Sequence, residues 1–202
     1  MRLIYGFDPL CGWCYGFAPA MRAVVAAHPD MPVTLALPGL VTGARIGPYA
    51  EMEGYIRGAS DRLRAVTGRA PSEAFFAHIA TPGVTGNSHP PIAAIAQVAE
   101  AAPQAELAFA QAICEAHFER GADLNRPETH AQIAGDLGLD LRPDPADTPR
   151  ALARMRADAA HGIASFPTLV VAAGDRRIAL PSIYTPGEVV AAVASVRERL
   201  AN

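Results

Sequence analysis

Residues 3–17 read LIYGFDPLCGWCYGF, an apolar run that stops at a proline and is followed by two cysteines in a CxxC pattern. The run from Leu3 to Phe7 has the length and the residue types of a buried strand, and Asp8-Pro9 cannot easily continue a sheet ladder. Apolar and small side chains then recur at helical spacing as far as Ala27. The stretch therefore predicts a strand, a short loop and a helix whose first turn carries Cys11.

The two cysteines have the spacing of a redox-active pair. Unpaired N–H groups and the positive end of the helix dipole favour an anion at Cys11, which makes its thiolate the expected nucleophile. Cys14 follows one helical turn later, where it can close a disulfide with Cys11 or resolve a mixed disulfide that Cys11 has formed. Gly12 and Trp13 carry no charge, so the sequence leaves the direction of exchange open. A metal clip and a merely packed thiol pair are the other interpretations of the pattern.

Composition limits the classes of function. The chain has 202 residues, 50% of them hydrophobic, and a formal net charge of −3. This content can form the core of one domain, or of a domain that carries an insertion. The arginines are scattered, so we expect no nucleic-acid partner. No lysine occurs in the sequence, which excludes Schiff-base chemistry, a P-loop and lysine general-base catalysis.

The sequence shows no sign of secretion or of membrane insertion. Met1-Arg2-Leu3 leads directly into the predicted strand without a signal-peptide pattern, and no run approaches about 18 to 20 apolar residues. Three cysteines are too few for a disulfide scaffold in a chain of this length. We therefore expect a cytoplasmic protein with no membrane partner.

The segments after the first helix predict one sheet domain interrupted by helices. Residues 31–37 favour a second strand, which completes a βαβ unit and places the dithiol at the carboxyl edge of the sheet. After a loop rich in Gly and Pro, helical patterns with Ser72 and Ser88 as N-caps cover residues 52–66, 72–79, 88–101, 104–120, 127–137 and 148–160. A hairpin and a final helix are then predicted over residues 166–171, 177–180 and 184–202.

Four segments together resemble the thioredoxin superfamily in its DsbA-like branch, and are most similar to the FrnE-type subgroup. They are DPLCGWCYGF (residues 8–17), FERGAD (118–123), LGLD (137–140) and GIASFPT (162–168). The resemblance covers nearly the whole chain. It implies an α/β thioredoxin-like fold (βαβ…ββα) formed by residues 1–45 and 162–202, with a large all-helical insertion domain at residues 46–161.

The activity that the resemblance implies is thiol:disulfide exchange by a protein disulfide oxidoreductase or isomerase. Such a protein acts on protein or small-molecule thiols and disulfides without a cofactor. In this chain Cys11 would be the exposed nucleophile and Cys14 its buried partner. The substrate site would include Gly12, Trp13 and Phe166.

The resemblance also implies a cis Phe166–Pro167 bond, with Pro167 part of the catalytic site. A cis bond is reasonable there, because only X-Pro bonds adopt it at modest cost and it lets the preceding residue pair with a substrate strand. On local sequence alone, a trans proline at the first residue of a strand is the alternative. Ser165 departs from the pattern, since such segments commonly carry glycine at that position.

Several residues near these motifs have two interpretations each. Trp13 can be an exposed contact for a substrate or a side chain packed against the insertion. Asp8 can accept a proton near the dithiol, or it can simply be a turn residue. His89 and His117 lie on predicted helices, where surface or hydrogen-bonded histidines are commoner than catalytic ones.

Cys114 raises the alternative of a zinc site. With His117 on the same helix face it would add a CxxH pair to Cys11 and Cys14, which is the right number of ligands for zinc. The separation of about 100 residues is much larger than in typical zinc sites, and cysteine is among the most often buried residues. We therefore expect no metal and a buried structural thiol at Cys114, with a third redox cysteine as the other alternative.

Two other classes of function stay open. A glutathione-dependent isomerase or transferase of the kappa-like type would activate its cofactor with a serine or one thiol, which leaves the second cysteine unexplained. A peptide-binding module built on the helical insertion would leave the whole dithiol unexplained. A thiol:disulfide oxidoreductase accounts for both cysteines, while the sequence does not indicate the oligomeric state.

Overall fold

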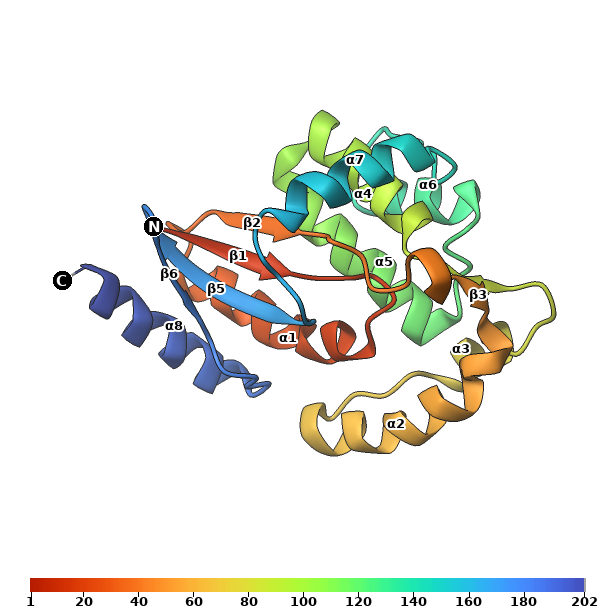
Figure 1. Ribbon diagram of the computed structural model, residues 1–202, viewed down its shortest axis with the longest axis horizontal. Helices are drawn as coiled ribbons and strands as arrows, with labels where there is room; N and C mark the ends of the chain where they lie inside the picture. Colours follow the sequence, from red (N-terminus) through yellow and green to blue (C-terminus); the bar gives the residue numbers. More distant parts are fainter. Residues whose placement is uncertain (202) are drawn as a thin grey trace.

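The computed structural model describes residues 1–201 and contains a four-stranded sheet flanked by helices (Figure 1). Strand β1 (Arg2–Gly6) lies inside the sheet, parallel to β2 (Val33–Ala36) and antiparallel to β5 (Thr168–Ala173). The edge strand β6 (Arg176–Ala179) pairs with β5, which gives the order β2-β1-β5-β6. The predicted βαβ start and the closing hairpin are therefore confirmed.

Two helices cover one face of this sheet. Helices α1 (Gly12–Ala27) and α8 (Pro186–Ala201) pack against each other there and bury the main hydrophobic core (Figure 1). The opposite face carries a smaller cluster, against which Ile163 packs; its members are Ile4, Ala36, Val170 and Ala172. Asn202, the predicted last residue of the final helix, lies outside the described residues.

Between β2 and β5 the chain forms helices and a small second sheet. The helices match the predicted ones to within a few residues: α2 (Glu53–Thr67), α3 (Glu73–Ile79), α4 (His89–Ala101), α5 (Glu106–Arg120), α6 (Pro127–Asp136) and α7 (Thr148–Ala159). Short 3-10 turns cover residues 43–45, 49–52 and 103–105. The antiparallel pair β3 (Gly47–Pro48) and β4 (Thr85–Gly86) was not predicted, because two residues per strand are too few to show an alternating pattern. None of the helices that the structure describes is both long and apolar enough to cross a membrane.

Helix α7 joins the inserted helices to the edge strand β2. Asp158 Oδ2 accepts the backbone N–H of Leu37 at 2.8 Å, and Arg154 donates to the carbonyl oxygen of Leu35 at 2.7 Å. Arg154 also pairs with Asp158 and with Glu106 of α5, both at 2.7 Å. These contacts occupy backbone groups that an edge strand leaves unpaired, so they fix the end of β2 beside the redox turn.

The two predicted serine caps have different outcomes. Ser72 caps α3 as predicted, because its hydroxyl accepts the Phe75 N–H at 3.1 Å. Ser88 occupies the N-cap position of α4 as predicted, but its side chain makes no capping hydrogen bond: its hydroxyl accepts the Val41 N–H at 2.9 Å and donates to Asp8 Oδ1 at 3.1 Å. The oxygen that would accept an N–H group of the first helical turn already accepts the Val41 N–H instead. Ser88 thereby links α4 to the loop that precedes the cysteines.

Candidate active site

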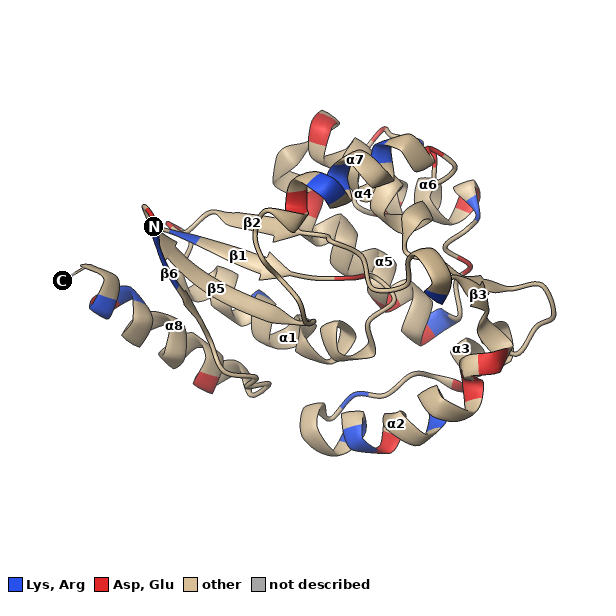
Figure 2. Ribbon diagram, in the orientation of Figure 1, with Lys and Arg blue, Asp and Glu red and all other residues tan. Residues whose placement is uncertain are grey.

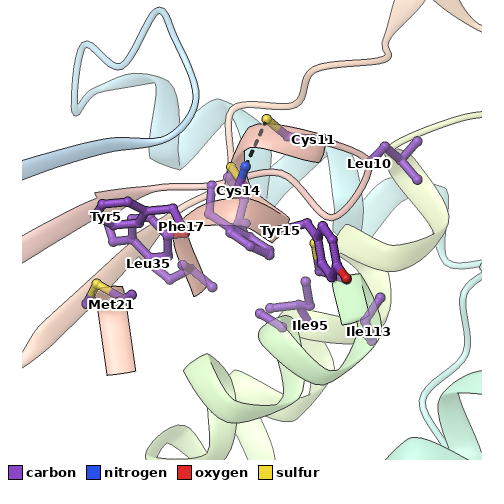
Figure 3. Close-up of a cluster of buried hydrophobic side chains, with 14 of the residues drawn as sticks. Tyr5, Leu10, Cys11, Cys14, Tyr15, Phe17, Met21, Leu35, Ile95 and Ile113 are labelled. Carbon is purple, nitrogen blue, oxygen red and sulfur yellow. Dashed lines mark hydrogen bonds between the residues drawn. The ribbon is translucent and has the colours of Figure 1, made fainter. Parts of the chain in front are cut away.

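Cys11 is the N-cap residue of α1, one position before the first turn in which it was predicted. Its backbone N–H donates to the carbonyl oxygen of Asp8 at 3.0 Å, which turns the chain from β1 into α1. Its sulfur accepts the backbone N–H of Cys14 at 3.4 Å (Figure 3). The unpaired N-terminal donor of the helix is thus oriented toward the sulfur that carries the negative charge in thiol exchange. Both cysteines are free thiols.

Both thiols are covered by protein. Cys14 is 0% exposed and Cys11 only 5%, so the prediction of an exposed Cys11 is wrong. Leu63 of α2, itself buried, packs beside Gly12, the residue after Cys11, and local sequence does not reveal this long-range contact. Burial raises the pKa of the Cys14 thiol, and a backbone hydrogen bond from Asp8 offsets this only in part. Cys14 is therefore a protonated thiol at rest.

The loop before β5 forms the second wall of the site. Its Phe166–Pro167 bond is cis, as predicted. The Cys11 thiol donates to the carbonyl oxygen of Phe166 at a sulfur–oxygen distance of 3.7 Å, so the two distant motifs meet. Ser165, which stands where glycine was expected, is exposed, and its carbonyl oxygen accepts the Thr168 hydroxyl at 2.7 Å. A side-chain hydrogen bond therefore holds the loop at the position of the departure.

A groove runs along this wall. It is a cavity of about 220 Å³ between the Phe166–Pro167 loop, the end of β6 and the start of α8. Its lining combines apolar side chains with polar groups, and includes Phe17, Pro167, Leu169, Leu180, Ile183 and Tyr184 as well as Ser165, Thr168 and Ser182. Hydrophobic and aromatic linings with a few polar groups are typical of ligand sites, so the groove can receive the apolar part of a substrate.

Gly16 lets α2 approach helix α1 closely beside the redox turn. A Cβ atom at Gly16 would lie 2.7 Å from Thr67 Cγ2 and 2.9 Å from Leu63 Cδ1. At Gly12 it would lie 3.6 Å from Leu63 Cδ2. Gly12, predicted at the substrate site, is half-buried beside α2, where a Cβ atom would make only ordinary van der Waals contact.

Trp13 is partly exposed, as a substrate contact would be, and partly packed, as the other interpretation expects. The residue is half-buried, and its ring lies 5.4 Å from the ring of Tyr184, which precedes α8. On the α2 side, the guanidinium of Arg62 lies 6.0 Å from the Trp13 ring centroid. Basic and acidic residues interleave along α2, so this cation comes from a mixed surface (Figure 2). Trp13 therefore bridges the inserted helices and the end of the chain.

Asp8 is a buried hub as well as a turn residue. Its Oδ1 accepts the Leu10 N–H at 2.9 Å, as expected of a turn, together with the Ser88 hydroxyl. Its Oδ2 accepts the Leu40 N–H at 2.7 Å. Burial raises the pKa of the carboxyl group to about 6, although these three hydrogen bonds act in the opposite direction. The network fixes the loop that presents Cys11.

Comparisons with known proteins agree with this geometry. No family model matches the chain, and neither does any curated protein. Among solved structures, the cytosolic disulfide reductase DsbM from Pseudomonas aeruginosa is 24% identical with a TM-score of 0.83, covering 99% of this chain and 100% of that one. The same protein solved with GSH is 22% identical, with a TM-score of 0.71 and full coverage of both chains (100% and 100%).

Two further solved structures extend the likeness. A putative protein disulfide isomerase from Nitrosomonas europaea is 24% identical with a TM-score of 0.76, covering 100% of this chain and 98% of that one. A probable DsbA oxidoreductase from Streptomyces coelicolor is 19% identical with a TM-score of 0.63, covering 98% and 90%. The chain has the DsbA-like thioredoxin fold. In this fold the predicted CxxC turn and Phe-Pro-Thr loop occupy the same edge of the sheet.

The four side chains of the zinc alternative, Cys11, Cys14, Cys114 and His117, do not form a metal-binding group in the described residues. His117 is buried, with Nε2 3.2 Å from Tyr49 Oη and Nδ1 3.1 Å from the Ala122 carbonyl oxygen, and burial lowers its pKa to about 4. Cys114 is buried in the same hydrophobic core as Cys14. Within residues 1–201, no three His, Cys, Asp or Glu side chains are grouped to hold a metal ion. His89 begins α4, and its backbone N–H donates to the Asn87 side-chain oxygen Oδ1 at 2.9 Å.

Sequence reasoning missed Arg62, Tyr184 and the role of Ser88. No motif marks the first two, because they reach the dithiol from segments far away in the chain. A signal did exist for the approach of α2: the spacing Gly12-x-x-x-Gly16 places two residues without side chains on one face of the predicted helix. That pattern indicates close packing, but it does not say which helix packs there.

Proposed function

We propose that this chain is a thiol:disulfide oxidoreductase whose redox pair is Cys11 and Cys14. The observation that carries the proposal is the position of the Cys11 sulfur, 3.4 Å from the Cys14 N–H and 3.7 Å from the Phe166 carbonyl oxygen. A helix N–H stabilises the thiolate, a buried thiol lies one turn behind it, and a groove with apolar side chains adjoins the facing loop. The first two features supply the chemistry of disulfide exchange, and the groove supplies a place for the substrate.

In the proposed reaction the Cys11 thiolate attacks one sulfur of a substrate disulfide and expels the other as a thiolate. A mixed disulfide then joins the substrate to Cys11. Cys14 loses its proton, attacks the Cys11 sulfur and releases the second substrate thiolate. The substrate gains two electrons and two protons, and the protein ends with a Cys11–Cys14 disulfide. A reducing thiol restores the pair by the reverse exchange.

The direction and the recycling thiol are the finer part of the proposal. We infer a cytosolic reductase recycled by a small anionic thiol of the glutathione type. One support is the Pseudomonas protein of the same fold, which is named a cytosolic disulfide reductase and was solved with GSH. Another is Arg62, which is exposed beside Trp13 and forms no ion pair with an acidic side chain in residues 1–201.

The reduction potential tests this proposal directly. The protein is equilibrated in glutathione redox buffers and the disulfide fraction is measured. A two-electron couple near about −270 mV is the expected result for a reductase. A value of about −120 to −180 mV would instead make the protein an oxidase or isomerase. Cys11→Ala should abolish the couple, whereas the control Cys114→Ala should keep it; a wild-type protein without any couple would refute the function.

A further inference from the structure

Helix α1 lacks one of its regular backbone hydrogen bonds directly after the redox pair. The carbonyl oxygen of Tyr15, the residue that follows Cys14, would normally accept the N–H of the residue four positions later. That residue is Pro19, which lies inside α1 and has no N–H group. The Tyr15 carbonyl oxygen is therefore free to accept a donor from another part of the chain, and backbone groups of buried residues are nearly always paired.

Arg69 supplies that donor. Its Nη1 donates to the Tyr15 carbonyl oxygen at 2.9 Å, and its guanidinium lies 3.9 Å from the centroid of the Tyr15 ring. Its Nη2 pairs with Glu119 Oε1 at 2.6 Å and with Glu115 Oε1 at 3.2 Å, both on α5. The Arg69 side chain is only 17% exposed. One guanidinium thus binds α1 and α5 at once, which its planar fork of donors allows.

Arg69 also fastens the end of α2. It follows Thr67, the last residue of that helix, by two positions, and its N–H donates to the Thr67 hydroxyl at 3.1 Å. The same hydroxyl donates to the Leu63 carbonyl oxygen at 2.8 Å, which ties Arg69 to the last turn of α2. Only two of the 15 residues of α2 are buried, so apolar burial gives this helix little support. This half of α2 carries Arg62, whose guanidinium lies 6.0 Å from the Trp13 ring centroid.

The first half of α2 has a separate attachment, made by Arg57. Arg57 Nη1 pairs with Glu73 Oε1 at 3.3 Å, and the Arg57 guanidinium lies 3.8 Å from the centroid of the Phe76 ring. Both partners belong to α3. Each half of α2 is therefore held by one stacked arginine, and the half beside the redox turn is the one that Arg69 holds.

We propose that Arg69 is a positioning residue: it makes the contact that Pro19 leaves open in α1, and by fixing the end of α2 it holds Arg62 beside Trp13. An anionic substrate then meets Arg62 at a fixed place next to the redox turn. Arg69 touches no reacting atom, so its loss should weaken binding and leave the chemical steps unchanged. The kinetic part of this inference rests on the proposed function, whereas the backbone contact does not.

A thermodynamic cycle on the full chain tests the backbone contact without any assay of activity. Arg69→Met keeps an apolar stem and removes every donor. In urea denaturation it should lower the folding equilibrium constant about tenfold more in the natural chain than in Pro19→Ala, where the new N–H can serve the Tyr15 carbonyl oxygen. The matched control Arg57→Met removes the other stacked arginine and should cost the same in both backgrounds. Equal costs of Arg69→Met in the two backgrounds would overturn the compensation for Pro19.

Two further readouts test the hold on Arg62. Trp13 is the only tryptophan in the sequence, so acrylamide quenching of the protein's fluorescence reports how well its ring is covered. Arg69→Met should increase the quenching. With oxidised glutathione it should raise KM about threefold to tenfold, as Arg62→Ala does, at unchanged kcat, and the double variant should show no further rise. Arg22→Met removes another cation paired with Glu115 and should change neither readout.

Other results would count against the hold on Arg62. Unchanged quenching in Arg69→Met, or KM increases that multiply in the double variant, would overturn it. Arg69→Lys keeps the charge without the fork of donors, so a full return to wild-type KM and quenching would also overturn it. A wild-type protein that does not reduce oxidised glutathione would refute the proposed function instead, and the Pro19 cycle and the quenching would still decide the role of Arg69.

Discussion

The Cys11 sulfur and the Phe166 carbonyl oxygen lie 3.7 Å apart, although 155 positions separate the two residues in the chain. The contact joins the turn after β1 to the loop before β5, so the nucleophile and the wall of the groove form one site. In the resting thiol, Cys11 donates to this carbonyl group. A substrate sulfur that bonds to Cys11 must therefore replace this interaction.

Cys14→Ala should trap the substrate on Cys11. Without the resolving thiol the mixed disulfide has no intramolecular route to release, since Cys114 lies buried on α5. Mass spectrometry after mixing with oxidised glutathione should show one adduct per chain, located at Cys11. The double variant Cys11→Ala, Cys14→Ala is the control and should stay unmodified. An adduct at Cys114 in that control would contradict the single-nucleophile mechanism.

Gly16→Ala should loosen α2 and destabilise the protein. The new Cβ would lie 2.7 Å from Thr67 Cγ2, and Thr67 is held by its hydroxyl, which donates to the Leu63 carbonyl oxygen at 2.8 Å. Overpacking of this kind costs about 1 to 3 kcal/mol in the free energy of unfolding, measured by urea denaturation. Cys11 should also be alkylated faster, because its cover is displaced.

The matched control for that change is Gly58→Ala on α2. A Cβ atom at Gly58 would meet nothing within 4 Å, so only helix propensity changes. We expect unchanged Cys11 alkylation and a gain of up to about 1 kcal/mol in stability. Equal effects of the two substitutions would show that α2 does not depend on the close approach at Gly16.

Asp8 and His117 should have opposite effects on stability between pH 4 and 6.5. The raised pKa of Asp8, about 6, means that the folded chain holds a proton that the unfolded chain has lost, so this stabilisation disappears as pH rises from about 4 to 6. The lowered pKa of His117, about 4, means that the unfolded chain binds a proton first, so stability falls as pH drops from about 6.5 to 4. Each effect amounts to about 3 kcal/mol.

Asp8→Asn should therefore make the protein more sensitive to acid. The variant loses the compensating carboxyl group, so its free energy of unfolding should drop by about 3 kcal/mol more than that of the wild type between pH 6.5 and 4. Urea denaturation at several pH values measures this difference. The control Asp61→Asn alters an exposed residue of α2 and should keep the wild-type dependence. If the free energy of unfolding depended on pH in the same way in the wild type and in Asp8→Asn, the opposite effects of Asp8 and His117 would be refuted.

Arg62→Ala should raise KM for an anionic disulfide substrate and leave kcat unchanged. The guanidinium lies beside Trp13 without an acidic partner in the described chain, so it can attract carboxylates in the bound and encounter states alike. We expect an increase in KM of about threefold to tenfold for oxidised glutathione at low salt, which fades at high salt.

Two comparisons sharpen the Arg62 experiment. A neutral disulfide such as hydroxyethyl disulfide should show no change in KM with the same variant. Arg64→Ala removes another exposed cation from α2 and is the matched control. A uniform change for both substrates, or equal effects of Arg62 and Arg64, would remove the case for a carboxylate contact at Arg62.

The sequence was sufficient for what depends on local patterns. Periodicity and turn residues located β1, α1 and the later helices, and the right-handed βαβ rule placed the dithiol at the carboxyl edge of the sheet. The resemblance to the DsbA-like branch implied that the Phe166–Pro167 loop lies beside the dithiol, and the structure adds the contact between Cys11 and Phe166. These inferences needed no knowledge of which helix packs on which.

The parts that were missed depend on long-range packing. The burial of Cys11 and the packing of α2 beside Gly12 and Gly16 both depend on contacts between distant segments, and the sequence of neither segment indicates the other as its partner. Local sequence could not show that the Ser88 hydroxyl bonds to Asp8, which lies far away in the chain, and not to the first turn of α4. Strand pairing at β3 and β4 rests on two residues each, below the length at which a pattern can be seen.

The position of Gly12 beside α2 bears on how this protein can be engineered. Exchanging the two residues between the cysteines is the direct way to alter the chemistry of a CxxC pair. A Cβ atom at position 12 would make ordinary van der Waals contact, 3.6 Å from Leu63 Cδ2 and 4.0 Å from Phe118 Cε1, so alanine fits there and a longer side chain would have these two residues as its neighbours. A mutant library should therefore vary Trp13 first, and should enlarge position 12 beyond alanine in combination with a smaller residue at Leu63.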